Sequence, residues 1–462
     1  MAVDLRALEP IYSKLPEVAP PPKPLTLKQK LMWVGFALIA FYTLSYIRPF
    51  GYDAAAASQT IEFFQVVLAS NIGSVLTAGI GPIVVASIIL QLFVGSGIIE
   101  VDLSTPEGRR AFMGTQKLLA VIFSIFEGFV FTGSYVKALP GMEWIVALQI
   151  AMGSIILMYL DELVMKWGIG SGISLFIAAN VSRSMLWRGF GYSPYAKGYF
   201  FQLLDSIAAG NIVNIITTML PFITTLLVFA LVVYAEGIHV DIPITWARAR
   251  GVGGRYPVRL LYLSNIPVIL AAALFANIQL WAFLAKDTPI APFLGTYELR
   301  NGRWVITGGL AYFTKPPYDL VTKLVAAAFG QPYATLWFDI LHAIIYAILL
   351  TLTSVVFGYL WLELSGMGPK QIAEQLVRSG FSLPGFRRDP RVVEQVLEKY
   401  IPTVAILGSA FVGLLAAFTD VFGALASGMG ILLAVTIVYR FYELLMRERM
   451  LEQYPMLAKV IG

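Results

Sequence analysis

Apolar residues run through this chain in long blocks that short polar stretches separate. Each block approaches the roughly 20 residues that an α-helix needs to cross about 30 Å of hydrocarbon. The pattern therefore predicts ten membrane-spanning helices. Their approximate bounds are Leu31–Ile47, Ile83–Ile99, Leu118–Val136, Trp144–Leu160, Ile173–Val181 with its flanks, Ile215–Tyr234, Leu263–Leu284, Ile340–Leu362, Ile401–Phe418 and Phe422–Phe441.

The segment Asn71–Ile99, which contains the second block, departs from this regular pattern. Its first third is diluted by Gly73, Ser74, Thr77, Gly79 and Gly81, and an unbroken apolar run follows Pro82. Lipid penalises unpaired backbone polar groups, so a broken segment at membrane depth survives only when it is buried in protein or lines a watery cavity. The segment therefore indicates a pore or a carrier.

Composition agrees that the bilayer is the solvent. Of the 462 residues, 58% are apolar and 13% charged, against roughly 45–50% and about 25% in soluble domains. Mean hydropathy is +0.75. The chain has no cysteine and two histidines, which argues against thiol chemistry and a histidine metal centre. It also has no GxxxxGK[ST] phosphate loop. We expect a protein that is not an enzyme and holds no cofactor or metal.

Basic residues set the expected topology. Most of the 33 Lys and Arg residues fall in the two termini and the even-numbered loops, so both ends are predicted to be cytoplasmic. Two long basic connections, Ala235–Arg259 and Glu363–Lys399, lie on that side. The outer loop from Ala285 to Trp337 contains an expected β-hairpin, Tyr297–Thr307, that turns at an Asn-Gly pair.

The segment before the first span has its own pattern. A weakly amphipathic run, Leu5 to Leu15, precedes a proline-rich link. This pattern suggests a helix that lies on the cytoplasmic membrane surface. A plain disordered tail is the alternative.

Ionisable residues inside a membrane normally mark ion or proton coupling. The candidates here are Glu127 in the third span and Asp339 with His342 at the outer end of the eighth; an interfacial position without a functional role is the alternative for the last two. Their scarcity argues against a proton-coupled transporter. The charges at span ends are read as ordinary solvated charges; they are Asp161, Glu162 and Asp420.

Four long blocks carry a family resemblance. They are GIGPIVVASIILQLFVGSGII from Gly79, MYLDELVMKWGIGSGISLFIAA from Met158, SNIPVILAAALFANIQLW from Ser264, and IVYRFYELLMRE from Ile437. In this order they closely resemble SecY, the channel subunit of the protein-conducting translocon. The resemblance covers essentially the whole chain, and its loop pattern is that of the archaeal and eukaryotic branch.

The resemblance implies an all-α polytopic membrane fold. Ten transmembrane helices would form two pseudo-symmetric inverted halves of five, with a re-entrant plug helix. The expected segments are a cytoplasmic N-terminal part over 1–30, an N-terminal half over 31–190 with the plug at about 70–78, a C-terminal half over 191–446 with loops 235–259, 285–337 and 363–399, and a cytoplasmic tail over 447–462.

The same resemblance implies the parts of a pore. A plug would swing on Gly79 and Gly81; its residues would be Ser70, Asn71, Ile72, Gly73, Ser74, Val75, Leu76, Thr77 and Ala78. A narrow aliphatic collar would resist wetting and deform around a passing chain. Matched by motif, the collar residues are Ile80, Val84, Ile173, Ile177, Ile269 and Leu433. The alternative for the glycines is close helix packing, and for the aliphatic residues an ordinary core or lipid-facing position.

A lateral gate is implied as well. Central Leu, Ile or Phe residues gain a few tenths of a kcal/mol in lipid, whereas Lys, Arg or Asp cost roughly 2.5–3.5 kcal/mol, so an apolar nascent segment would leave sideways. The matching positions are Val85, Glu127 and Asn277. Val85 replaces a threonine common in relatives, and Glu127 has the alternative of a neutral, hydrogen-bonded buried acid.

Basic loops complete the expected picture. The candidate ribosome-docking residues are Arg248, Arg250, Arg255, Arg259, Arg387, Arg388 and Arg391; such clusters attract phosphate-rich RNA, although they also serve as topology signals. The resemblance implies two companion subunits, a SecE-type clamp and a small beta-type (SecG/Sec-beta) subunit. It also implies the following partners: the large ribosomal subunit with its rRNA, the signal recognition particle pathway, nascent polypeptide and membrane lipid. The implied location is the plasma membrane. The competing interpretations are a secondary transporter of a small solute and a scaffold without a pore.

Overall fold

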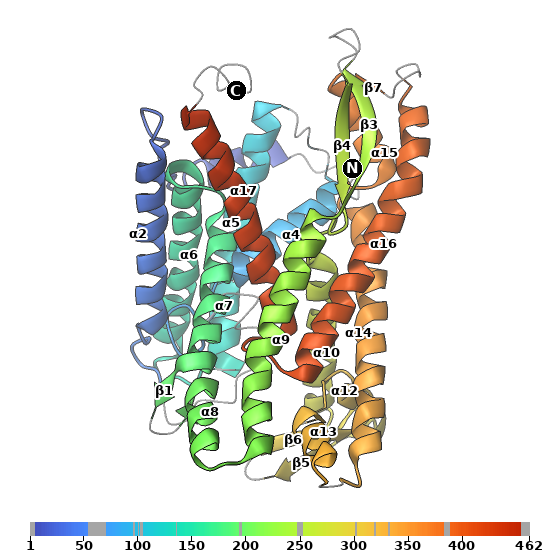
Figure 1. Ribbon diagram of the computed structural model, residues 1–462. Helices are drawn as coiled ribbons and strands as arrows, with labels where there is room; N and C mark the ends of the chain where they lie inside the picture. The colour runs from blue at the N-terminus through green and yellow to red at the C-terminus, as the bar shows by residue number, and fades with distance from the viewer. Residues whose placement is uncertain are drawn as a thin grey trace. The chain divides into compact units, whose positions relative to one another are not determined.

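The structure is a computed structural model of the 462-residue chain (Figure 1). It describes residues 5–53, 71–95, 98–99, 101, 105–134, 136–193, 196–246, 253–300, 303–317, 320–330, 333–382 and 389–453. The chain divides into two compact units. Unit 1 comprises Met1–Ser182 and Ile437–Gly462, and unit 2 comprises Arg183–Thr436. Each unit is described by itself below.

Unit 1 is helical. It contains the 3-10 helix η1 (Leu5–Leu8) and the helices α1 (Glu9–Tyr12), α2 (Leu27–Tyr46), α4 (Gly81–Gly95), α5 (Pro106–Ser134), α6 (Glu143–Trp167) and most of α7 (Gly172–Phe190), together with the later part of α17 (Gly428–Gln453). Helix α2 begins with a reciprocal cap, in which the side chains of Thr26 and Gln29 each accept a hydrogen bond from the other residue's backbone N–H. Helix α5 packs between α4 and α6.

Unit 2 adds strands to its helices. Its elements are β1 (Tyr192–Ser193), β2 (Ala196–Lys197), α8 (Tyr199–Ala208), α9 (Ile212–Gly237), β3 (His239–Trp246), β4 (Gly253–Arg259), α10 (Ile266–Leu284), α11 (Ala291–Leu294), β5 (Thr296–Arg300), β6 (Arg303–Gly308), α12 (Leu310–Phe313), α13 (Leu320–Ala328), α14 (Leu336–Leu364), α15 (Pro369–Arg378), β7 (Phe381–Ser382) and α16 (Pro390–Phe422). Helices α10, α14 and α16 pack together.

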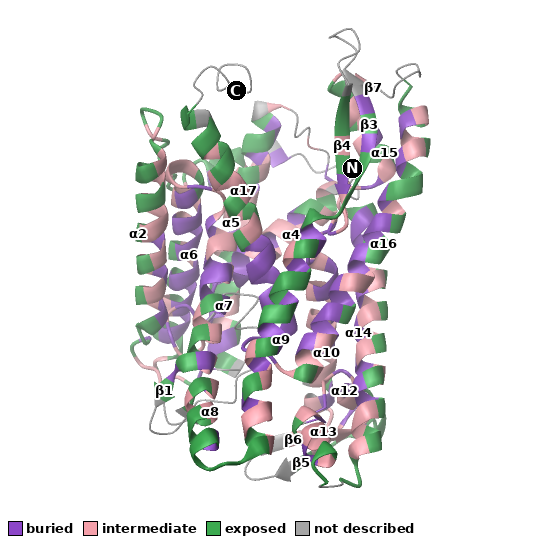
Figure 2. Cartoon of the chain, viewed as in Figure 1, coloured by how far each residue is buried: buried purple, intermediate pink, exposed green. Residues whose placement is uncertain are grey.

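Every predicted span falls on a helix, in order: α2, α4, α5, α6, α7, α9, α10, α14, α16 and α17. Six helices in the described part of the chain are long and apolar enough to cross a membrane, namely α5, α6, α9, α14, α16 and α17. Many large apolar side chains along α9 and α14 are exposed (green in Figure 2), as lipid-facing helices require. The chain is therefore a mostly helical, multi-pass membrane protein.

The β-structure contains one expected and one unexpected feature. Strands β5 and β6 pair antiparallel with Arg300 opposite Arg303, which confirms the predicted hairpin; its position on the outer side stays a prediction. The unexpected feature is a three-stranded sheet in the order β4-β3-β7. Because Thr245 pairs with Ser382, the two long basic connections form one folded structure. Sequence alone had presented them as separate prongs.

Two of the charges read as solvated prove to be structural. Asp161 is buried, and its Oδ1 accepts hydrogen bonds from the Ile173 N–H at 2.8 Å and the Ser171 hydroxyl at 3.3 Å. Asp420 in unit 2 accepts from the Gly428 N–H at 2.8 Å and from the Tyr346 hydroxyl at 3.0 Å. Each carboxylate pairs donors at a helix start that would otherwise lack partners. The solvated interpretation was wrong for both residues.

The Asp161 contact predicts a large effect of substitution. In Asp161→Ala the first turn of α7 loses a buried acceptor, which costs about 1–3 kcal/mol. We expect a lower thermal unfolding midpoint in detergent, measured by circular dichroism. Asp161→Asn keeps an oxygen acceptor and is expected to lie between the wild type and Ala. Equal midpoints for all three proteins would contradict this role.

Candidate functional site

The segment before α4 forms successive turns. Residues Asn71–Ile80 contain no helix, so the expected plug helix does not lie over Asn71–Ala78; Ser70 is outside the described residues. Gly73 and Gly79 have φ angles of +88° and +57°, which L side chains rarely adopt. The turns lead directly into α4, where Pro82 is the second residue and its missing N–H costs little.

This segment is tied to its surroundings within unit 1. The Asn71 side-chain amide donates to the Ser45 carbonyl at 2.5 Å, and the Val75 N–H donates to the Ile47 carbonyl at 2.9 Å. On the other side, a Cβ added to Gly153 of α6 would lie 2.0 Å from the Val75 carbonyl oxygen. These contacts anchor the segment against the C-terminal end of α2 and the middle of α6. A hinge at Gly79 and Gly81 stays a prediction.

Unit 1 gathers four of the collar candidates in one apolar cluster. Ile80 is completely buried, and Val84, Ile173 and Ile177 are partly buried and pack against the same core. That core contains Phe41 and Phe176, whose rings stack at 5.1 Å, together with Leu76, Ile83 and Leu157. Residues nearly a hundred positions apart in sequence thus pack in one aliphatic cluster. That this cluster lines a hydrophobic constriction stays a prediction.

The other two candidates, Ile269 and Leu433, belong to unit 2. Ile269 is partly exposed, and Leu433 is 8% exposed. The side chain of Asn265 donates to the Thr436 hydroxyl at 3.2 Å. Asn265 lies four positions before Ile269, and Thr436 lies three positions after Leu433. Positions three and four apart share a helix face. This buried hydrogen bond therefore joins the start of α10 to α17 within one helical turn of both aliphatic residues. Sequence reasoning missed Asn265, although a polar residue at the start of an apolar run was a usable signal.

The lateral-gate candidates lie on three different helices. Val85 is on α4 and Glu127 on α5, both half-buried, whereas Asn277 is on α10 and its side chain is outside the described part. Among the described residues, none forms a hydrogen bond with Glu127. The alternative of a hydrogen-bonded buried acid is not tested by the described residues. The gate itself stays a prediction.

The basic loops present an exposed surface on unit 2. Arg255 on β4 is exposed and pairs with Asp241 at 3.2 Å, and Arg259 ends the same strand. Arg391 is exposed in the first turn of α16. The sheet brings these two connections together. The remaining docking candidates lie outside the described residues; they are Arg248, Arg250, Arg387 and Arg388.

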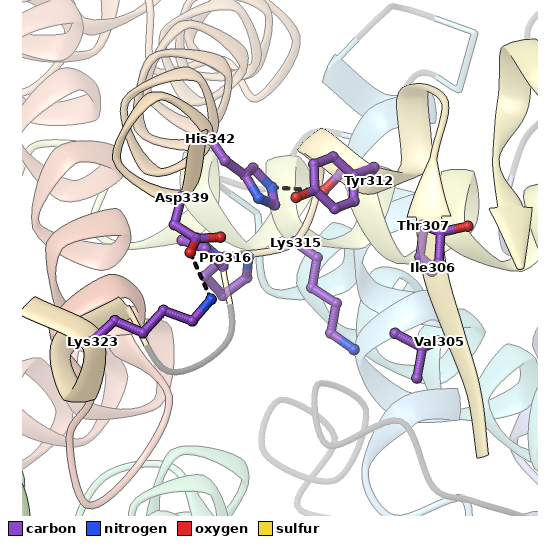
Figure 3. A pocket seen from close by; sticks show the side chains of 10 residues that line it. Val305, Ile306, Thr307, Tyr312, Lys315, Pro316, Lys323, Asp339 and His342 are labelled. Atoms are coloured by element: carbon purple, nitrogen blue, oxygen red, sulfur yellow. Dashed lines mark hydrogen bonds and ion pairs between the residues drawn. The ribbon is translucent and has the colours of Figure 1, made fainter. Parts of the chain in front are cut away.

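A pocket of about 300 Å³ lies beside the start of α14 (Figure 3). In it, Lys323 donates to Asp339 at 2.6 Å, while Nε2 of His342 contacts the Tyr312 carbonyl oxygen at 2.9 Å. The His342 and Tyr312 rings stack at 4.0 Å. These contacts pair the Asp339 charge and pack His342 against α12. These contacts therefore join α12, α13 and α14. The Asp339 carboxylate is already paired with Lys323, so it is not a free ligand for a small solute.

The fold and the aliphatic cluster define a class: a multi-pass membrane protein in which a broken segment packs against an aliphatic core cluster. The family model named SecY matches residues 74–442. The protein translocase subunit SecY of Methanocaldococcus jannaschii is 44% identical over 461 residues, which cover 99% of this chain and 100% of the relative. The chain belongs to the SecY family.

Two solved structures agree with this assignment. One, described as showing that the plug domain of SecY stabilises the closed state of the translocation channel and maintains a membrane seal, has a TM-score of 0.72 and 43% identity. The other, Sec61 in the canine ribosome-channel complex from the endoplasmic reticulum, has the same TM-score and identity. Each comparison covers 97% of this chain and 98% of the other. The resemblance seen in the sequence is confirmed.

Proposed function

We propose that this chain is the channel-forming subunit of a Sec translocon, which conducts unfolded polypeptides across the membrane and releases apolar segments sideways into lipid. Its relative's name as a translocase subunit supports this function. The single structural observation that carries it is the cluster of Ile80, Val84, Ile173 and Ile177 in unit 1. A branched aliphatic surface binds no ion and adapts to varied side chains.

The full collar in this proposal has six members. Unit 1 supplies the four residues of that cluster, and unit 2 supplies Ile269 and Leu433. The ten helices would form two inverted halves of five over 31–190 and 191–446. In the closed state the anchored segment Asn71–Ala78 would be part of the plug region, in line with the sealing role described for a plug domain in a relative.

Lateral release follows from partitioning rather than from a chemical step. A gate near Val85, Glu127 and Asn277 would expose a nascent segment to lipid, and the segment's own transfer free energy would decide whether it leaves. Unfolded polypeptide and membrane lipid are then the two ligands of the channel. The protein itself needs no cofactor for this selection, and no nucleotide-hydrolysis site is proposed for it.

The proposal also assigns partners and a location. The basic surface formed by the two connections, with Arg255 on β4 and Arg391 on α16, would bind rRNA of the large ribosomal subunit, since a relative was solved in a ribosome-channel complex. Delivery would use the signal recognition particle pathway. A SecE-type clamp and a small beta-type subunit would complete the complex in the plasma membrane, with both termini in the cytoplasm.

Photo-crosslinking tests the proposed path directly. A photoreactive amino acid is placed at Val84, Ile177 or Leu433, and a ribosome-stalled secretory chain is added to the reconstituted complex. We expect all three positions to label the stalled chain. Leu226 on α9, with 70% exposure, is the control and should label lipid instead. Labelling confined to exposed helix surfaces would favour a scaffold without a pore, and uptake of a small solute by the complex would favour the transporter alternative.

A further inference from the structure

Residues Leu5–Ala19 pack against other parts of unit 1. Residues Leu5–Ala19, which we call the strap, contain η1 and α1 followed by an extended stretch. Side chains from α4, α5 and α6 all contact the strap. Neither sequence alternative, a surface helix or a disordered tail, anticipated this arrangement.

A polar clamp holds the C-terminal part of the strap. Glu162 of α6 accepts from Lys117 of α5 at 2.8 Å, from Lys166 at 2.9 Å, and from the Val18 N–H at 3.2 Å. Lys166 also donates to the side chain of Glu17 and to the Val18 carbonyl, both at 2.6 Å. Glu162 is therefore not the solvated charge that its position at a span end suggested. It joins three segments of the chain.

Two further strap carbonyls are paired with helix side chains. The Lys117 ammonium donates to the carbonyl of Pro16, and the Trp167 indole N–H donates to the carbonyl of Ala19 at 2.8 Å. The side chains of Glu162 and Lys117 are only 14% and 16% exposed. Such a shielded network is worth more than an exposed ion pair, so the strap has a defined seat on α5 and α6.

Tyr12 fixes the middle of the strap to α5. Its side chain is 8% exposed, and a Cβ added to Gly114 would lie 2.4 Å from the Tyr12 ring. Only glycine at position 114 leaves room for the ring. Gly114 has no side chain and so leaves space on α5 for the ring of Tyr12, about a hundred positions earlier in the sequence.

Leu5 completes the seat at the other end of the strap. It is 2% exposed and packs in a cluster with Leu90 of α4, Ile99 and Ala111 of α5. The strap thus reaches the C-terminal end of α4, the helix that begins beside Ile80 and carries Val84 and Val85. A shift of this end of α4 relative to α5 would uncover Leu5 and expose apolar surface to water.

We propose that the strap is a positioning element that keeps α4 against α5 in the closed channel and leaves its seat when polypeptide passes. The inference rests on the proposed channel function. Movement of α4 and release of the strap are linked, because the Leu5 contact exists only when α4 and α5 are in the described arrangement, and any group that binds one state preferentially shifts the equilibrium between them. A strap that only adds stability would not need to move.

A reversible tether tests whether the strap must move. The chain has no cysteine, so the double variant Tyr12→Cys with Gly114→Cys has a single possible intramolecular disulfide. A Cβ added to Gly114 would lie 2.7 Å from the Tyr12 Cγ, which is one bond from the Tyr12 Cβ, so the two Cβ atoms are within reach of a disulfide. In the reconstituted complex, oxidation is expected to lower the rate of secretory-chain translocation at least about five-fold, and reductant to restore it.

The controls separate this inference from the channel function itself. The cysteine-free wild type and the reduced double variant must both translocate; failure of the wild type would count against the proposed function, not against the strap. Mass spectrometry verifies that the disulfide has formed. A fully tethered complex that translocates at the wild-type rate would overturn the strap proposal.

A second pair of variants loosens the strap without a tether. Leu5→Ser removes a buried contact, whereas Ile11→Ser alters a side chain that is 53% exposed in the same strap. We expect Leu5→Ser to make trypsin cleavage at Lys14 faster and to raise translocation of a substrate with a weakened signal sequence about three-fold, while Ile11→Ser leaves both unchanged. Faster cleavage with unaltered translocation would show a merely structural strap and contradict the proposal.

Discussion

Replacing Ile80 with Asp is expected to raise the resting ion conductance of the reconstituted complex at least about ten-fold, because a charged group in a narrow hydrophobic constriction holds water and cations there. Ile80 is completely buried at the end of the anchored segment, in the cluster with Val84, Ile173 and Ile177. The same change at Ile269 tests the contribution of unit 2. Planar-bilayer recordings of the purified complex without a translocating chain measure the effect.

Matched variants show whether the effect belongs to the collar. Ile80→Leu keeps an aliphatic side chain of equal size and should retain the low conductance. Ile223→Asp places the same charge on α9, where the side chain is 49% exposed, and should not open an ion path. A conductance that stays at the wild-type value in an assembled Ile80→Asp complex would remove Ile80 from the seal.

Sequence periodicity predicted the helices well because lipid leaves a helix few alternatives. Long apolar blocks must satisfy their backbone groups internally, so each predicted span coincides with a helix of the structure. Short amphipathic elements gave a weaker signal. Helices α8 and α15 were missed, since ten residues of mixed polarity are compatible with a loop as well as with a helix.

Contacts between distant segments were beyond the reach of sequence patterns. Nothing in the two basic connections indicates that Thr245 pairs with Ser382, because strand register depends on tertiary partners. The carboxylates of Asp161, which is buried, and Glu162, which is partly buried, likewise look like ordinary charges at a helix end until their donors are placed. Residue roles in the collar and gate came from motif resemblance, since one aliphatic membrane residue looks like another.

Gly153→Ala is expected to weaken both the fold and the seal, because the new methyl group would meet the Val75 carbonyl oxygen at 2.0 Å. No L side chain tolerates that approach, so either the anchored segment or α6 must shift, at a cost of about 1–3 kcal/mol. Val75 belongs to the segment that leads into Ile80, and its backbone N–H donates to the Ile47 carbonyl on the other side. A shift there should therefore disturb the collar.

The measurement combines thermal unfolding in detergent with resting conductance in a planar bilayer. Gly133→Ala is the matched control, because an added Cβ on this residue of α5 has nothing within 4 Å, and alanine in an open helical position should stabilise by roughly 0.5–1 kcal/mol. We expect a lower unfolding midpoint and a higher conductance for Gly153→Ala only. A lower midpoint with unchanged conductance would mean that the anchored segment supports the fold but does not position Ile80, and the seal would then depend on the helices alone.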